Sequence, residues 1–254
     1  MIETHCHLNS SRFQKDRAAV LDRARRAGVT HLVEVGYDVR TSERAVALAA
    51  AEPDVWATVG LHPHEVAKAA PDAAATLARL ARAPRVVAVG EIGLDFYRDL
   101  SPRDRQREWF RAQLALAAEA DLPVVIHTRD AWDEMLHILA AHGPRRRGIL
   151  HCYSGTAAQA RRGVELGYAL GIGGSLTYGD AELEAAVREA PRDALVLETD
   201  APYLVPAPQD VKRNEPALLA RVRAAVAAVR GKTIEEVDAF TTENARRILA
   251  LTAG

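Results

Sequence analysis

The chain opens with the stretch Met1-Ile2-Glu3-Thr4-His5-Cys6-His7-Leu8-Asn9, an apolar start that runs into two histidines separated by one residue. Successive side chains of a β-strand point to opposite faces, so His5 and His7 share a face while Cys6 points away. Two imidazoles on one face at a strand end can chelate a single divalent ion. Taken alone, the pair fits equally well with one histidine packed in a core and the other solvated, and the rest of the chain has to decide.

Short apolar runs typical of β-strands alternate with amphipathic helical stretches along the whole chain. The strand-like runs are Met1–His5, His31–Gly36, Val55–Gly60, Arg85–Glu91, Pro123–His127, Gly148–His151, Tyr168–Ile172 and Leu195–Asp200. Helical patterns cover, among others, Lys15–Ala27, Thr41–Ala51, Pro102–Ala120 and Thr156–Leu166. Several runs are apolar almost without interruption, as in strands buried on both faces of a parallel sheet. Eight strand–helix alternations in 254 residues predict an α/β fold, a (β/α)8 TIM barrel that forms one domain over residues 1–254.

An open, doubly wound α/β sheet is the alternative fold. Such a sheet normally carries a glycine-rich phosphate-binding turn after its first strand. Here that turn holds His5-Cys6-His7 instead, which favours the barrel. The one long irregular segment, Pro202–Pro216, follows the eighth predicted strand, and barrels build their sites from the loops after strands. We therefore expect it to be a substrate loop.

The composition is that of an ordinary globular protein. Hydrophobic residues make up 48% of the chain, enough for a large core, and the net charge of −1 gives no overall basic field for nucleic acids. A nucleic-acid site with few, local contacts remains compatible with that balance. Two cysteines argue against a disulfide framework, and we find no signal peptide and no apolar run long enough to cross a membrane. These features predict a cytoplasmic protein.

Side chains that can bind metals end five of the predicted strands. They are His5, His7, Glu91, His127, His151 and Asp200. Because the carboxyl ends of all barrel strands converge on one face, these side chains are expected to meet. Each one alone is compatible with a satisfied core histidine or a helix-capping carboxylate, but their joint placement predicts a metal centre. Histidine and carboxylate ligands suit zinc, manganese or a similar ion, whereas magnesium prefers more oxygen ligands.

Six ligands are too many for one catalytic ion that must keep open positions, so the set predicts two divalent ions with a bridging carboxylate. Glu91 is the best bridge, because a carboxylated lysine is not available: none of the lysines ends a predicted strand. The lysines are Lys15, Lys68, Lys212 and Lys232. Asp200 is the best acceptor for a proton of the nucleophile. Glu198, two residues earlier, is either a second acid/base group or part of a buried ion pair.

Short motifs along nearly the whole chain resemble those of the TatD-type metal-dependent deoxyribonucleases. They are Thr4-His5-Cys6-His7-Leu8, Gly60-Leu61-His62-Pro63-His64, Gly90-Glu91-Ile92-Gly93-Leu94-Asp95, Ile126-His127-Thr128-Arg129, His151-Cys152-Tyr153-Ser154-Gly155, Glu198-Thr199-Asp200-Ala201-Pro202-Tyr203, Arg213-Asn214-Glu215-Pro216 and Thr242-Glu243-Asn244-Ala245-Arg246. The resemblance implies a barrel of the metallo-dependent hydrolase superfamily. Its implied activity is hydrolysis of DNA phosphodiester bonds, as an exonuclease, by a metal-activated water at a binuclear site.

The resemblance also implies how the ligands divide between two divalent ions (Mg, Mn or Zn). His5, His7, Glu91 and Asp200 would hold one ion, and Glu91, His127 and His151 the other. Glu91 and Asp200 would be the catalytic carboxylates. Glu3 and Asn9 depart from the family, which commonly has aspartates at these positions, and both lie outside the implied ligand set. The environment behind the ligands is therefore expected to differ.

Several residues near the predicted strand ends are candidates for binding the DNA substrate. They are His62, His64, Tyr97, Arg98, Arg129, Tyr153, Ser154 and Arg213. Arg129 would clamp a phosphate bidentately, or else pair with Asp130. The aromatic and hydroxyl side chains suit stacking on single-stranded ends. Asn214 and Glu215 would complete the pocket, whereas the basic run 145–147 is expected to be a solvated turn.

Two other functions remain open. The same two metals could serve an ester or amide hydrolase acting on aminoacyl-tRNA or a small metabolite, because the fold alone does not decide the reaction. A non-catalytic binding or scaffold barrel is the alternative of another class, and the complete ligand set argues against it. An assay of DNA and of a generic ester, with and without chelator, separates these readings.

Overall fold

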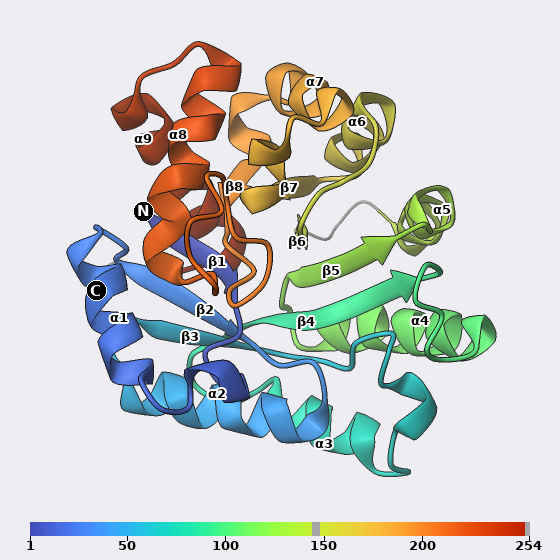
Figure 1. The fold of residues 1–254 in the computed structure, drawn as a ribbon. Coiled ribbons are helices and arrows are strands. Elements are labelled where there is room, and N and C mark those ends of the chain that lie inside the picture. Colours follow the sequence, from blue (N-terminus) through green and yellow to red (C-terminus); the bar gives the residue numbers. More distant parts are fainter. Residues whose placement is uncertain (144–147, 252–254) are drawn as a thin grey trace.

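The computed structural model describes residues 1–143 and 148–251 and contains an eight-stranded parallel sheet. The strands are β1 (Ile2–Cys6), β2 (His31–Val35), β3 (Val55–Val59), β4 (Val86–Asp95), β5 (Val124–Arg129), β6 (Gly148–Leu150), β7 (Tyr168–Ile172) and β8 (Leu195–Leu197). They pair in chain order from β1 to β8. Figure 1 shows them at the centre of the molecule with the helices outside.

The sheet closes because the chain just beyond β8 pairs with β1. Cys6 and Ala201 form a parallel bridge. Asp200 donates its backbone N–H to the carbonyl of His5 at 3.0 Å, and His7 donates to the carbonyl of Ala201 at 2.8 Å. The predicted (β/α)8 barrel is confirmed, and the open sheet is excluded.

Helices connect the strands and cover the outside of the sheet. They are α1 (Arg17–Arg26), α2 (Val39–Ala51), α3 (Ala73–Leu80), α4 (Arg103–Glu119), α5 (Trp132–His142), α6 (Ala157–Glu165), α7 (Ala181–Glu189), α8 (Leu219–Arg230) and α9 (Ile234–Leu249). Local sequence sets some of the starts: Asp38 and Thr41 form a capping box at α2. Apolar faces pack inward, so that Phe110 of α4 and Ile92 of β4 share one buried cluster. In the described part of the chain, no helix is long and apolar enough to cross a membrane.

The amino end of the barrel is closed by an apolar plug. Ile248 and Leu249 of α9 pack in one cluster with residues from inside the barrel, among them Ile2, Val33 and Val125. This cluster fills the end of the barrel opposite to the predicted ligands. The predicted ligands therefore lie at the other, carboxyl end.

Most strands end within two residues of the predicted position, but β4 and β8 differ by more. β4 was expected to end at Glu91 but continues to Asp95. Gly93 permits this because its φ is +143° and a Cβ there would lie 1.9 Å from the carbonyl oxygen of His127, so only glycine fits beside β5. β8 was expected to reach Asp200 but ends at Leu197, and Asp200 takes a left-handed backbone with φ of 55° that stops a regular strand.

Candidate metal centre

Glu91 stands at the centre of the polar cluster and presents its two carboxylate oxygens to different histidines. Its Oε2 lies 3.5 Å from His5 Nε2 and 3.9 Å from His7 Nε2. Its Oε1 lies 3.1 Å from His127 Nδ1 and 3.4 Å from His62 Nε2. Each carboxylate oxygen therefore faces a different group of imidazoles. A carboxylate that bridges two metal ions needs this arrangement.

Asp200 faces the same cluster from the chain beyond β8. Its Oδ1 lies 3.3 Å from His7 Nε2 and 3.8 Å from His5 Nε2. His151 Nε2 lies 3.9 Å from both Asp200 Oδ1 and Glu91 Oε1. All six side chains predicted to bind metals thus meet at the carboxyl end of the barrel.

Three groups in the described residues have ligand atoms within 4.8 Å of one another. The first is His5, His7 and Asp200, and the second is His62, Glu91 and His127; the third is His5, His151 and Glu198. In the second group, His62 stands beside Glu91 and His127, where His151 was expected. His62 itself was predicted to bind substrate. Distances alone leave both histidines as candidates.

The group next to the other ring nitrogen distinguishes these two histidines. His62 Nδ1 accepts the backbone N–H of His64 at 3.1 Å, so a neutral His62 ring carries its proton on Nε2, the atom that faces Glu91. His151 Nδ1 lies 2.8 Å from the carboxylate oxygen Oε1 of Glu198, and this negative charge favours a neutral ring with its proton on Nδ1 and a lone pair on Nε2. His151 therefore offers a ligand atom to the centre, whereas His62 offers a hydrogen-bond donor.

Asp95 determines which ring nitrogen of His127 carries the proton. Its Oδ2 accepts hydrogen bonds from His127 Nε2 at 2.9 Å and from His64 Nε2 at 2.8 Å. In the neutral ring this leaves the lone pair on Nδ1, the atom that faces Glu91. Burial acts to lower the pKa of His127, but the hydrogen bonds to Asp95 and Glu91 raise it to about 9 in the absence of metal. Asp95 belongs to one of the sequence motifs, but no role was predicted for it. Asp95 shares a strand with Glu91, four residues later, and this could have indicated its role if β4 had been predicted to continue to Asp95.

The charges of the cluster are set by burial and by close pairing. Burial acts to raise the pKa of Glu91, but the surrounding histidines outweigh it and hold that pKa well below its usual value. Burial lowers the pKa of His62 to about 4 despite the nearby Glu91. Burial also acts to lower the pKa of His7, yet its hydrogen bond to Asp200 raises it to about 9. At neutral pH without metal, Glu91 is ionised and His62 is neutral.

Two further buried carboxylates hold the backbone that carries His5 and His7. Glu3 Oε1 accepts the backbone N–H groups of His5 and Thr199, both at 3.0 Å. Glu34 on β2 accepts the N–H of Leu8 at 2.5 Å and that of Asn9 at 3.0 Å. Burial raises the pKa of Glu3 to about 8 and that of Glu34 to about 7. Glu34 was not predicted from the sequence, although an acidic residue inside an otherwise apolar strand could have pointed to it.

The candidate substrate residues do not all face the cluster. The guanidinium of Arg129 lies 3.9 Å from the ring centroid of Tyr97, and no ion pair joins it to Asp130 among the described residues. Arg98 and Ser154 are exposed on loops after β4 and β6. His64 lies beside Asp95 rather than beside Glu91.

Two of the candidates are engaged elsewhere. Tyr153 is only 1% exposed and donates its hydroxyl to the carbonyl of Thr156, so its ring is not offered for stacking. Arg213 forms ion pairs with Asp16 and Glu215 that tie the loop after β8 to α1. We leave both out of the proposed substrate contacts. The basic run 145–147 lies outside the described residues.

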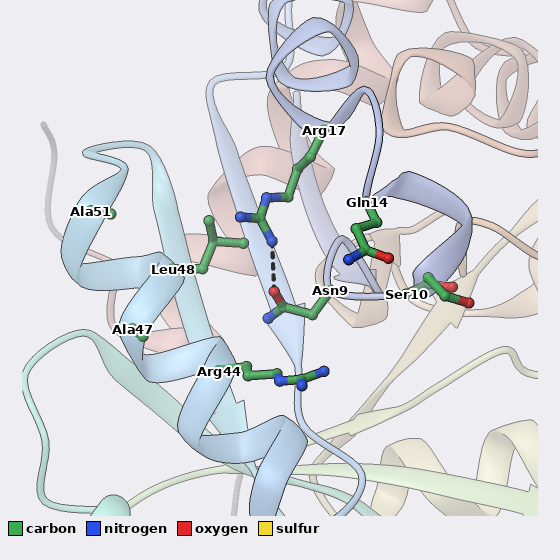
Figure 2. A pocket seen from close by; sticks show the side chains of 9 residues that line it. Asn9, Ser10, Gln14, Arg17, Arg44, Ala47, Leu48 and Ala51 are labelled. Carbon is green, nitrogen blue, oxygen red and sulfur yellow. Dashed lines mark hydrogen bonds between the residues drawn. The ribbon is translucent and has the colours of Figure 1, made fainter.

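A cavity of about 580 Å³ lies apart from the cluster, on the flank of the barrel between α1 and α2. Figure 2 shows Arg17, Arg44 and Asn9 lining it, with Arg17 donating to Asn9 Oδ1 at 2.8 Å. None of the six predicted ligands lines this cavity. The chemistry therefore belongs to the carboxyl end of the barrel and not to this pocket.

A parallel barrel with histidines and carboxylates gathered at its carboxyl end defines a hydrolase of the metal-dependent barrel class. The family model described as TatD related DNase matches residues 2–250. The chain belongs to this family, as the sequence motifs predicted.

Relatives and solved structures agree with this assignment over the full length. A 3'-5' ssDNA/RNA exonuclease TatD of Erwinia tasmaniensis is 40% identical over 99% of this chain and 100% of the relative. A protein of Bacillus subtilis named uncharacterized metal-dependent hydrolase YabD is 38% identical over 99% of each chain. The crystal structure of YJJV, a TatD homolog from Escherichia coli, superposes with a TM-score of 0.94 and 34% identity, covering 99% of this chain and 98% of that one.

Proposed function

We propose that the protein is a two-metal nuclease that hydrolyses phosphodiester bonds at the 3' end of single-stranded DNA. The observation that carries this proposal is the placement of Glu91, whose two oxygens face separate groups of imidazoles. Membership of the TatD-related family supports the reaction, and the name of the Erwinia relative supports the polarity and the single-stranded substrate. That name also makes RNA a candidate substrate.

The proposed ligand sets follow from the distances in the cluster and, for His151 against His62, from the ring nitrogen that keeps a lone pair. His5, His7 and Asp200, together with Glu91 Oε2, would hold one ion. Glu91 Oε1, His127 and His151 would hold the other. Nitrogen and carboxylate donors of this kind suit Zn²⁺ or Mn²⁺ and also admit Mg²⁺ with added waters. Bound there, divalent ions would lower the pKa of a coordinated water and neutralise charge on the phosphodiester.

The protein's own groups orient these ligands and move protons. Asp95 holds His127, and the fully buried Glu198 holds His151, so both carboxylates act as positioning residues. Asp200 faces the cluster with 15% of its side chain exposed, and in this proposal its carboxylate takes the proton of the attacking water. The Nε2–H of His62 lies 3.4 Å from Glu91 Oε1, and in this proposal it turns to donate to a phosphate oxygen of the substrate.

Substrate contacts would come from loops at the mouth of the barrel. Arg129, supported by the ring of Tyr97, would clamp a phosphate, and Arg98 would add charge from the same side. We further propose that the enzyme works in the cytoplasm, where Cys6 and Cys152 would stay reduced.

The test is a cleavage assay with oligonucleotides labelled at one end or the other. The purified protein is loaded with Mg²⁺, Mn²⁺ or Zn²⁺ and given single-stranded DNA, double-stranded DNA, single-stranded RNA and a generic ester. We expect stepwise shortening from the 3' end of the single strand, complete loss of cleavage with EDTA, and recovery on adding metal. Hydrolysis of the ester without cleavage of any nucleic acid would overturn the proposal.

A further inference from the structure

Large apolar side chains are exposed on only one end of the described molecule. They are Tyr37, Tyr97, Leu100, Tyr178, Tyr203 and Val211. Each follows the carboxyl end of a strand and precedes the next α-helix: β2 for Tyr37, β4 for Tyr97 and Leu100, β7 for Tyr178, β8 for Tyr203 and Val211. Exposed aromatic side chains concentrated around one polar centre indicate a binding function.

Two of these tyrosines flank a proposed metal ligand. The ring centroid of Tyr37 lies 5.8 Å from that of His7, and the ring of Tyr203 lies 6.1 Å from it, each edge-on to the imidazole. Tyr37 is 36% exposed and Tyr203 is 49% exposed, so each ring keeps a large free surface. The two rings come from segments after β2 and β8, the strands on either side of β1 in the closed barrel.

An arginine accompanies Tyr203 as one accompanies Tyr97. The guanidinium of Arg12, an exposed residue, lies 5.4 Å from the ring centroid of Tyr203. On the side of β4 and β5, Arg129 lies over Tyr97. The barrel order puts β8 and β1 across the ring of strands from β4 and β5. Aromatic–cation pairs therefore stand on opposite sides of the cluster around Glu91.

We propose that Tyr37, Tyr203 and Arg12 form a nucleobase clamp beside His7 that stacks a base of a single-stranded substrate, an inference that rests on the nuclease function proposed above. Every base has a flat face for the rings, and the guanidinium pairs with the adjoining phosphate, so the clamp binds without reading sequence. Tyr97 and Arg129 hold the nucleotide across the scissile phosphate. A protein partner would need one continuous apolar patch, whereas here the rings are separated by a polar centre.

The clamp predicts a preference for an intact base over an abasic residue at one substrate position. Stacking on an aromatic side chain changes binding by about 5- to 150-fold per base. Wild-type enzyme should therefore show a KM about tenfold or more higher when an abasic residue replaces the base held by the clamp. Scanning the abasic residue along the last nucleotides of the 3' end locates that base.

The experiment combines this substrate series with variants of the clamp. Tyr37→Ala and Tyr203→Ala together should raise KM for the intact strand to that of the abasic strand, while kcat and bound metal stay at wild-type values. Tyr37→Phe and Tyr203→Phe should keep the discrimination, because the ring remains. Tyr178→Ala is the matched control: this ring is 45% exposed, and its hydroxyl is donated to Val205, away from the clamp.

A second measurement does not depend on cleavage. A strand with 2-aminopurine at the clamped position should lose fluorescence when it binds the wild-type protein and keep it with the double alanine variant. Absence of both quenching and abasic discrimination in a protein that cleaves DNA would overturn the clamp alone. Absence of cleavage by the wild-type protein would overturn the nuclease function, while the quenching still decides whether the rings stack on a base.

Discussion

The two ends of the barrel interior differ in polarity. At the amino end, Ile248 of α9 packs against Ile2 and Val33 in a fully apolar cluster. At the carboxyl end, Glu91 and Asp200 are surrounded by imidazole rings. The apolar end contributes hydrophobic stability, and the polar end holds buried charges that carry the chemistry. Substitutions at the two ends should therefore affect different measurements.

The largest effect is expected at Glu91, the proposed bridge. Glu91→Gln should lower kcat by at least about a thousandfold, because an amide offers one weak oxygen ligand where the carboxylate offers two charged ones. Melting and circular dichroism should show a folded barrel, since the amide keeps the volume of the side chain. Substantial turnover by a variant that still binds two metals would refute the bridging role.

A substitution in the apolar plug should act on stability and leave the chemistry alone. Ile248→Ala should lower the free energy of unfolding by about 2–5 kcal/mol, the range for losing a buried aliphatic side chain. Turnover per folded, metal-loaded molecule should stay at the wild-type value. Denaturant titration and active-site metal content measure the two quantities separately. A fall in kcat without loss of stability would contradict the division between the two ends.

The positioning carboxylates should have an intermediate effect. Asp95→Ala removes the acceptor for His127 Nε2, so affinity for the second metal should fall about 10- to 100-fold, as seen when such partners of metal ligands are lost. Metal titration by calorimetry measures this loss. Asp130→Ala, on the loop after β5, serves as the control and should bind metal normally.

Paired histidine variants sharpen the assignment of the second ion. His151→Ala should reduce metal content towards one ion per chain, because it removes a proposed ligand nitrogen. His62→Ala should keep both ions and raise KM for DNA, because His62 presents N–H rather than a lone pair to Glu91. The reverse result, with metal lost from the His62 variant only, would exchange the roles of the two residues.

The smallest effect concerns the phosphate clamp. Arg129→Ala should raise KM by about tenfold, the value of one charged hydrogen-bonding contact, and should leave metal content unchanged. The effect should shrink as salt rises, because a phosphate contact is screened. No change in either KM or turnover would remove Arg129 from the substrate site.

Much of this protein was determined by local features of its sequence. The alternation of apolar runs and helical patterns fixed the barrel, because strand and helix periodicities are set by residues close in the chain. The barrel then implied that Glu91, His127 and His151 would meet, since strand ends of a barrel converge whatever the loops do. The TatD motifs identified the family for the same reason: each is a short, contiguous stretch.

Only the tertiary structure decided how these residues are oriented and which loops join them. The protonated nitrogen of a ring depends on distant partners: Asp95 lies 32 residues before His127, and Glu198 lies on the chain after β8, far from His151 in sequence. The burial of Tyr153 and the exposure of Tyr203 are likewise invisible in a motif, because both follow strand ends. Orientation is a property of side chains packed from distant segments, so the sequence predicted which side chains meet and only the fold decided how they face one another.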